Sequence, residues 1–247
     1  MLNHVAPISP AALTGCCDAG IDRSSLERPV HRDVVGPWQL LVADAREAGF
    51  DLAIASGYRD YQRQLRIWNA KACGERDVLN ADGSVLSLAA GDEWARASAI
   101  LRWSALPGAS RHHWGTDIDV YDRAAVADSY VLQLTADEVA DDGPFGPLHR
   151  WLDQRIAADR AHGFFRPYAS DRGGIAPERW HLSYAPVAAC YQRELNATTL
   201  WAALASPDLL LCDTVAAHWP DIFKRYVWVP AEAYPENYRE LLMDVRA

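Results

Sequence analysis

The order of the predicted elements constrains the fold of this 247-residue chain more than any other feature. Helices come first and short strands follow, without the repeated strand–helix–strand rhythm of a parallel sheet. The predicted helices are residues 37–48, 60–71, 92–103 and 147–162. The predicted strands are residues 51–56, 116–121, 164–166, 180–184 and 226–229. We therefore expect an α+β fold, in which helices pack on a small, mostly antiparallel sheet.

The composition is that of a globular protein with one large core. Half of the residues are hydrophobic, which at this length removes roughly 70–75% of the unfolded surface from water. We expect a single domain over residues 1–247, mostly helical after Pro186. The five cysteines are odd in number and lack the spacing of a disulfide framework, so we expect them to be reduced and mostly buried.

The net charge of −9 argues against nucleic acid and anionic membranes as partners, because both attract clustered Lys and Arg. The sequence has no run of eighteen apolar residues, so no membrane span is expected. It also starts without the basic and apolar regions of a secretory signal. This predicts a cytoplasmic protein, or a periplasmic or cell-envelope one if a leader is missing; the oligomeric state is not readable.

One stretch, from Ser110 to Asp119, combines residues that bind divalent metal ions. It reads Ser-Arg-His-His-Trp-Gly-Thr-Asp-Ile-Asp. Gly115 permits a sharp bend, which can bring the imidazole of His112 back over a carboxylate of the following strand. Strand alternation puts Asp117 and Asp119 on one face, where two carboxylates repel each other unless a cation lies nearby. The pattern alone does not choose between these two carboxylates as the metal ligand.

A second stretch, Glu178-Arg-Trp-His181, supplies another imidazole and a spare carboxylate. Prolines at positions 177 and 186 leave too little room for a helix, so a short strand is expected. Glu178 then lies in the loop before the strand, and His181 shares the inner face of the strand with Ser183. Two imidazoles and a carboxylate can hold zinc and leave a position for water, and a carboxylate beside that water can act as its base.

An arginine completes the set. Arg59 lies between a predicted strand and a predicted helix, where side chains are held over a cleft. Its planar guanidinium can bind a carboxylate or a developing oxyanion through two parallel hydrogen bonds. Gln64 can face the same cleft. Trp114 is a candidate for lining it, with a packing role as the alternative.

In order and spacing, these motifs resemble those of the VanY-type D-alanyl-D-alanine carboxypeptidases. The matching stretches are Ser56-Gly-Tyr58-Arg59 with Gln64, Ser110-x-His112-x-x-Gly115-x-x-x-Asp119 and Glu178-x-Trp180-His181. The zinc peptidase group that contains this family also includes VanX-type dipeptidases, some phage endolysins and the hedgehog signalling domain. The resemblance covers residues 35–186 and leaves 187–247 as an extension outside the peptidase core.

The resemblance implies that His112, Asp119 and His181 ligate one Zn²⁺ ion, and so it selects Asp119 as the carboxylate ligand. It implies Glu178 as general base and later acid, and Arg59 as the group that stabilises the tetrahedral intermediate or holds the substrate. The candidate substrate-binding residues are Tyr58, Gln64, Ser110 and Trp114. The implied reaction is hydrolysis, by metal-activated water, of the terminal bond of peptidoglycan stem peptides ending in D-Ala-D-Ala.

Two positions depart from the family pattern. Arg179 stands where a Pro often follows the catalytic Glu, and Asp117 stands where a small residue is usual. The extra carboxylate is expected to support a ligand or to alter metal affinity. The alternative functions are an L,D-carboxypeptidase or peptidoglycan endopeptidase with the same zinc site, and a non-catalytic metal-stabilised binding module. Because a structural zinc needs neither Glu178 nor Arg59, we favour the enzyme.

Overall fold

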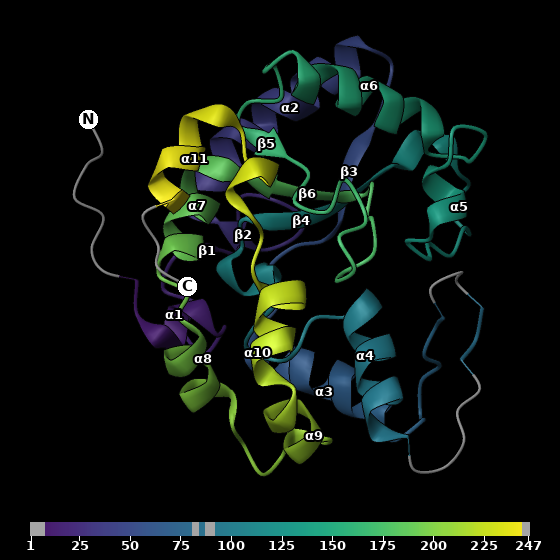
Figure 1. The fold of residues 1–247 in the computed structure, drawn as a ribbon. Coiled ribbons are helices and arrows are strands. Elements are labelled where there is room, and N and C mark those ends of the chain that lie inside the picture. Colours follow the sequence, from purple (N-terminus) through teal and green to yellow (C-terminus); the bar gives the residue numbers. More distant parts are fainter. Residues whose placement is uncertain (1–7, 81–83, 87–91, 244–247) are drawn as a thin grey trace.

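The computed structural model describes residues 8–80, 84–86 and 92–243, and a four-stranded sheet lies at the centre of this part of the chain (Figure 1). Its strands run in the order β3 (Leu52–Ser56), β4 (Asp117–Asp122), β6 (His181–Tyr184) and β5 (Phe164–Phe165). Neighbouring strands are antiparallel throughout, and β4 and β6 form the middle pair. The expected α+β fold with a small antiparallel sheet is confirmed.

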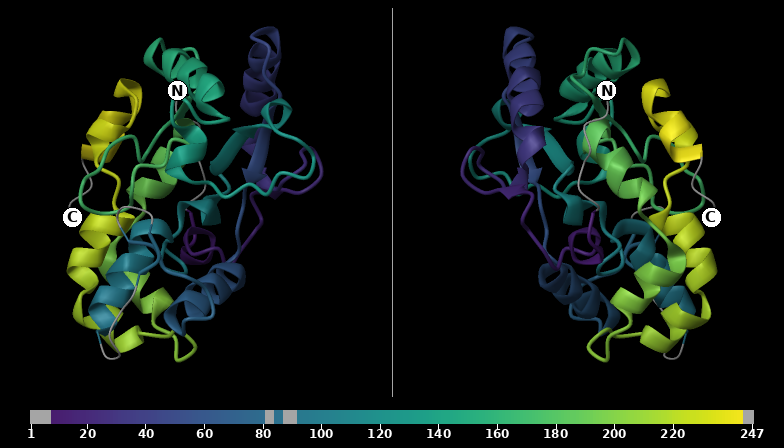
Figure 2. Two further views of the ribbon diagram at one scale, coloured as in Figure 1. Left: turned by 90° about the vertical axis from the view of Figure 1, so that its right-hand side faces the viewer. Right: turned by 90° about the vertical axis from the view of Figure 1, so that its left-hand side faces the viewer.

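One face of the sheet is apolar and carries two helices. Ile118 and Val120 of β4 and Leu182 of β6 point to this face, because alternate residues of a strand share a side. They pack in one core with apolar side chains of α2 (Val35–Glu47) and α6 (Gly146–Ala157). Figure 2 shows the two helices together at one end of the molecule.

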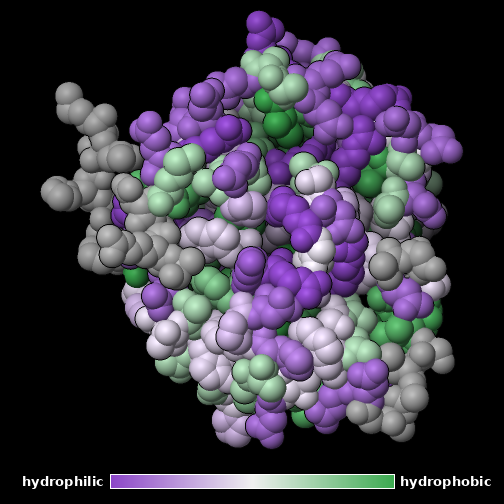
Figure 3. Space-filling model, in the orientation of Figure 1, coloured by the Kyte–Doolittle hydropathy of each residue, from purple (hydrophilic) through white to green (hydrophobic). Residues whose placement is uncertain are grey.

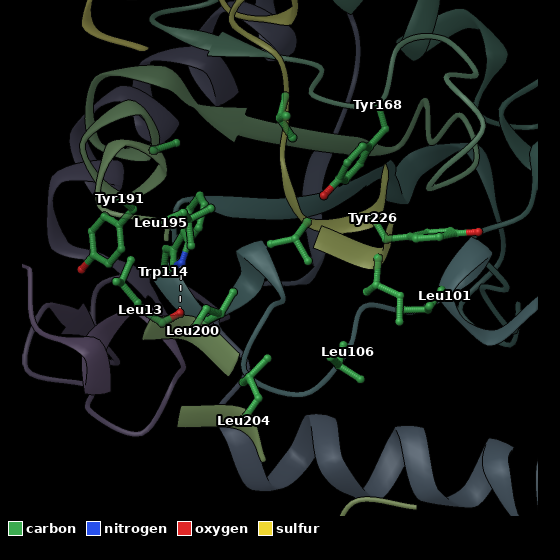
Figure 4. Close-up of a cluster of buried hydrophobic side chains, with 14 of the residues drawn as sticks. Leu13, Leu101, Leu106, Trp114, Tyr168, Tyr191, Leu195, Leu200, Leu204 and Tyr226 are labelled. Carbon is green, nitrogen blue, oxygen red and sulfur yellow. Dashed lines mark hydrogen bonds between the residues drawn. The ribbon is translucent and has the colours of Figure 1, made fainter. Parts of the chain in front are cut away.

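A second core lies on the other side of the sheet, among helices from the middle and the end of the chain (Figure 1). These helices are α3 (Tyr61–Ala72), α4 (Glu93–Trp103), α7 (Ala185–Arg193), α8 (Ala197–Leu204), α9 (Cys212–Ala217), α10 (Trp219–Ile222) and α11 (Glu236–Met243). The indole of Trp114 lies inside this core beside Leu13 and Leu195, and its Nε1 donates to the Leu13 carbonyl (3.1 Å; Figure 4). The loop that carries the candidate ligands is thus anchored in packed hydrophobic structure.

Short elements complete the fold. They are α1 (Pro10–Leu13), β1 (Ile21–Asp22), β2 (Val30–His31), α5 (Ala136–Val139), the 3₁₀ turns η1 (Arg32–Val34), η2 (Arg111–Trp114), η3 (Arg123–Ala125) and η5 (Ala231–Ala233), and the π-helical turn η4 (Phe223–Val227). β1 and β2 pair with each other. The His31 N–H then donates to the carbonyl of Gly115 (2.8 Å), which ties β2 to the turn that follows η2.

Two sequence-based expectations about elements are wrong. Residues 226–229 do not form a strand: Val227 ends the π-helical turn, and its apolar neighbours are buried among helices rather than in a sheet. The helix predicted over 147–162 ends at Ala157, because Asp159 and His162 adopt the left-handed φ values of 54° and 51°. Apolar spacing reports burial in both stretches, and backbone geometry decides the element.

None of the five cysteines is fully buried. All five are free, but Cys16 and Cys73 are exposed and the other three are half-buried, so the expectation that most are buried is wrong. Cys73, for example, caps the end of α3.

No helix in the described ranges is long and apolar enough to cross a membrane. Figure 3 shows hydrophilic side chains across much of one face, with scattered hydrophobic ones.

Candidate metal centre and its cavity

Three side chains from distant parts of the sequence meet in one buried cluster. His112, Asp119 and His181 each offer one ligand atom, and these atoms lie within 4.8 Å of one another. His112 Nε2 lies 3.4 Å from one carboxylate oxygen of Asp119, and His181 Nδ1 lies 3.3 Å from the other. The residues that the sequence singled out as metal ligands are therefore brought together.

The sheet and one tight turn create this meeting. Asp119 of β4 lies directly opposite His181 of β6, so their side chains project from the same face. His112 comes from η2, and Gly115 at its end adopts a left-handed φ of 68°. A Cβ at Gly115 would also lie 2.6 Å from the backbone nitrogen of His31, so only glycine fits this bend.

The second nitrogen of each imidazole is held by a hydrogen bond. Nδ1 of His112 donates to the Gly57 carbonyl (2.9 Å), which directs Nε2 toward Asp119. Nε2 of His181 donates to Asp117 (2.9 Å), which directs Nδ1 toward the cluster. Because a carbonyl and a carboxylate only accept, both rings present an unprotonated nitrogen to the cluster when neutral. Asp117 therefore supports a ligand.

The electrostatics of the cluster suit a cation. Burial lowers the pKa of His181, but hydrogen bonds to Asp117, Asp119 and Glu178 outweigh burial and raise it well above its usual value. Burial raises the pKa of Asp119, but the charge and hydrogen bonds of both imidazoles outweigh it and lower that pKa. Three carboxylates around one imidazole favour positive charge, and two nitrogens with one oxygen form a donor set that zinc accepts.

Glu178 lies beside the cluster from the loop before β6, as expected. One of its carboxylate oxygens is 3.2 Å from His181 Nδ1, and its side chain is 13% exposed at the cavity wall. A turn fixes this position, since the His181 N–H donates to the Glu178 carbonyl (3.1 Å). Arg179 points elsewhere and forms an ion pair with Asp153 (2.7 Å). The departure from Pro at this position thus anchors the loop to α6.

Arg59 is held at the edge of the same cavity. Its guanidinium donates to Gln64 (2.7 Å) and Ser56 (3.2 Å), which fixes its direction. Its Nε is buried and has no hydrogen-bond partner within the described part of the chain. Arg59 itself lines the cavity, so its guanidinium is held within reach of a bound substrate.

The cluster opens into a cavity of about 600 Å³, which is large enough for a short peptide. Its wall includes Ser110, whereas Gln64 lies behind Arg59 and supports it. Tyr58 and Trp114 are buried and do not line the cavity: the Tyr58 hydroxyl faces the Gly15 carbonyl, and Trp114 packs in the helical core. Of these candidates, Ser110 therefore lines the cavity, and Trp114 has the packing role that was the alternative.

Sequence reasoning missed several cavity residues, among them Tyr168 and Lys71. Tyr168 lies edge-on to the His181 ring, with ring centroids 4.9 Å apart. Lys71 lies on the cavity-facing side of α3, one turn after Ile67, and donates to Ser104 (2.7 Å). Helical spacing from Gln64 would have indicated Lys71, whereas nothing in the sequence marks Tyr168.

A family model described as VanY, D-alanyl-D-alanine carboxypeptidase, matches residues 27–187 of the chain. Two uncharacterized proteins of Haemophilus influenzae are similar to it. One is 47% identical over 72 residues, which are 29% of this chain and 49% of that protein. The other is 30% identical over 123 residues, which are 49% of this chain and 92% of that protein. The matched stretch thus spans about half the length of the first of these relatives.

A D-alanyl-D-alanine carboxypeptidase of Enterococcus faecalis is 28% identical over 149 residues, which are 59% of this chain and 44% of that protein. Among solved structures, a mutant of the vancomycin resistance D,D-pentapeptidase VanY in complex with Zn(II) is 25% identical. It has a TM-score of 0.46 and covers 69% of this chain and 80% of its own. VanYB in complex with D-alanine-D-alanine is 23% identical and has a TM-score of 0.48. The match covers 77% of this chain and 91% of VanYB.

Proposed function

The chain belongs to the VanY family of D-alanyl-D-alanine carboxypeptidases, and on that premise we propose that it is a zinc-dependent carboxypeptidase of peptidoglycan stem peptides. The proposed reaction is hydrolysis of the terminal peptide bond of a stem peptide that ends in D-Ala-D-Ala. One observation carries the proposal: the donor atoms of His112, Asp119 and His181 meet within 4.8 Å, with the carboxylate of Glu178 beside them at a cavity wall.

The residues divide the chemistry among them. His112, Asp119 and His181 would hold a zinc ion, which when bound would acidify a water molecule and polarise the scissile carbonyl. Glu178 takes a proton from the attacking water and passes it to the leaving amine. Arg59 lines the cavity, and its guanidinium donates to the carbonyl oxygen as that oxygen gains negative charge. Ser110, at the cavity wall, is placed to hold the peptide backbone.

The charges of the cavity favour a carboxypeptidase over an endopeptidase. A carboxypeptidase must bind the free carboxylate of its substrate, whereas an endopeptidase need not. Arg59, Lys71 and Arg76 line the cavity, and neither Lys71 nor Arg76 forms an ion pair within residues 8–80, 84–86 and 92–243. Burial and the positive charges of Arg76 and Arg59 lower the pKa of Lys71. This is expected where several cations lie together without an anionic ligand.

Features that a structural metal site does not need favour an enzyme over a metal-stabilised binding module. A structural zinc site is closed by four protein ligands, whereas this cluster has three and opens into a cavity. A module of that kind would have no need of a carboxylate beside the ligands or of an arginine at a cavity wall. Glu178 and Arg59 are both present in those positions.

Release of D-Ala from defined peptides tests the proposal. The purified protein is loaded with one equivalent of zinc and given a pentapeptide ending in D-Ala-D-Ala, a tetrapeptide whose terminal D-Ala follows an L-centre, and the C-terminal amide of each. We expect the pentapeptide acid to be cleaved fastest, with activity lost to a chelator and restored by zinc. Faster cleavage of the tetrapeptide would identify an L,D-carboxypeptidase. Cleavage of no peptide by the zinc-loaded protein would overturn the proposal.

A further inference from the structure

Asp117 is a buried carboxylate that orients a candidate metal ligand. It has no solvent exposure, and its Oδ1 accepts the hydrogen bond from His181 Nε2. Its Oδ2 accepts from Thr116 (2.6 Å) and Ser183 (3.0 Å). An ionised carboxylate is stable at such depth only beside a positive charge. Asp117 therefore needs a cationic partner. Because Asp117 orients His181, the position of His181 also depends on the contacts that hold this cation in place.

That partner is Arg111, the second residue of the motif that carries His112. Its Nε donates to Asp117 Oδ1 (2.8 Å), and Nη2 donates to Ser183 (2.7 Å). The guanidinium lies 4.6 Å from the centre of the Trp114 ring, which covers one of its faces. These contacts explain how the charge of Asp117 is tolerated, but they leave Nη1 to be satisfied from elsewhere in the chain.

The segment beyond the family match satisfies Nη1. Nη1 of Arg111 donates to the Tyr234 hydroxyl (2.9 Å) and to Gln192 Oε1 (3.1 Å). Both acceptors are fully buried and are themselves fixed. Gln192 donates to the Val229 carbonyl (3.0 Å), and the Tyr234 ring packs on Phe165 at 4.5 Å. Gln192 lies on α7, which packs against both β6 and α11 (Figure 1).

We propose that the C-terminal segment of this chain is part of its metal centre, because Gln192 and Tyr234 position Arg111. Arg111 in turn fixes Asp117, and Asp117 orients His181 for the metal. This inference rests on the metal site of the proposed function and assigns a role to residues outside residues 27–187. Gln192 and Tyr234 are positioning residues, since neither lines the cavity.

Zinc affinity of the apoprotein tests this role without any peptidase assay. The apoprotein competes for zinc with a chromophoric chelator, and each variant is first shown to be folded by thermal unfolding. Asp117→Asn is expected to weaken zinc binding about 10–100-fold, as loss of a hydrogen-bond partner of a metal ligand does. Tyr234→Phe and Gln192→Met, which act one step further away, are expected to weaken it by about 10-fold, the lower end of that range.

Two controls make the test specific. Tyr226→Phe removes a hydroxyl from another buried tyrosine of the same segment that does not touch Arg111, and should leave zinc affinity unchanged. Tyr234→Phe should have little further effect once Asp117→Asn is present, because both act on one path. Equal zinc affinity in Tyr234→Phe, Gln192→Met and Tyr226→Phe would overturn the inference, as would an undiminished effect in the double variant. Failure of the unaltered protein to bind zinc would instead overturn the proposed function.

Discussion

Asp119 and His181 lie directly opposite each other on the antiparallel strands β4 and β6, and this pairing places two of the three candidate metal ligands on one rigid face. Strand pairing has a side-chain period of two, so a slip of one residue would put Ile118 opposite His181. The apolar residues Ile118 and Leu182, buried on the opposite face, resist that slip. The core therefore fixes the geometry of the site.

Removal of Glu178 should separate metal binding from turnover. Glu178→Ala leaves the three ligand side chains in place but removes the base beside them. We expect retained zinc stoichiometry and a kcat lower by about 10²–10⁴-fold, the range that general acid–base catalysis supplies. The exposed residue Glu75 gives the matched control, Glu75→Ala, with unchanged kcat. An active Glu178→Ala protein would remove this residue from the mechanism.

Replacement of Arg59 distinguishes oxyanion stabilisation from substrate binding. Arg59→Met removes the guanidinium donors at the cavity wall while keeping a side chain of similar length. If the donor acts on the developing oxyanion, kcat falls about 10²–10³-fold and KM changes little. We expect this result in steady-state kinetics with a D-Ala-D-Ala peptide. A raised KM with unchanged kcat would show that Arg59 only holds the substrate.

Lys71 should matter for substrates with a free carboxylate. Lys71→Met removes one of the cavity cations that lack a carboxylate partner in the described ranges. KM for the free acid should rise roughly 10–100-fold, because a hydrogen bond to a charged group is worth roughly 1.5–3 kcal/mol. KM for the C-terminal amide should barely change. Lys224, which is exposed and outside the cavity, provides the control Lys224→Met; equal effects on acid and amide would argue against this role.

The bend at Gly115 should tolerate no side chain. Gly115→Ala puts a Cβ at a φ of 68° and 2.6 Å from the His31 backbone nitrogen. The left-handed conformation alone costs about 1–2 kcal/mol, so the melting temperature should fall by several degrees and zinc affinity should decrease. Gly36→Ala is the matched control, because it lies in α2 with open space around it and should be neutral or slightly stabilising.

Acid should destabilise the fold partly through His149. Burial, together with the nearby charges of Arg166 and Arg179, lowers the pKa of His149 to about 2. The unfolded chain binds a proton there below a pH of about 6.5, whereas the folded chain does not. As the pH decreases from about 6.5 to about 2, the unfolding free energy therefore decreases. His149 contributes about 1.4 kcal/mol to this decrease for each pH unit.

A histidine replacement checks that sign. His149→Gln cannot protonate, so its unfolding free energy, measured by denaturant titration at pH 7, 6 and 5, should fall less steeply than that of the unaltered protein. His218→Gln changes a half-buried histidine that stacks on Trp94 and serves as the control. Parallel pH profiles for His149→Gln and the unaltered protein would contradict the assignment.

Local patterns predicted most of the elements that carry the site. The alternation in residues 116–121 and the two prolines at 177 and 186 predicted the central strands β4 and β6. Gly115 predicted the bend, and its φ of 68° confirms it. The same patterns failed at residues 226–229, where burial among helices imitates the composition of a strand.

The sequence by itself determined the donor types, their strand phase and the bend between them, because these depend on residues close together in the chain. It left Asp117 and Asp119 equivalent, since both point to one face of β4. Only the tertiary structure separated their surroundings: Arg111, held by Gln192 and Tyr234, lies against Asp117, whereas two imidazoles meet at Asp119. That choice depends on contacts between segments up to 123 residues apart, and no local spacing records them.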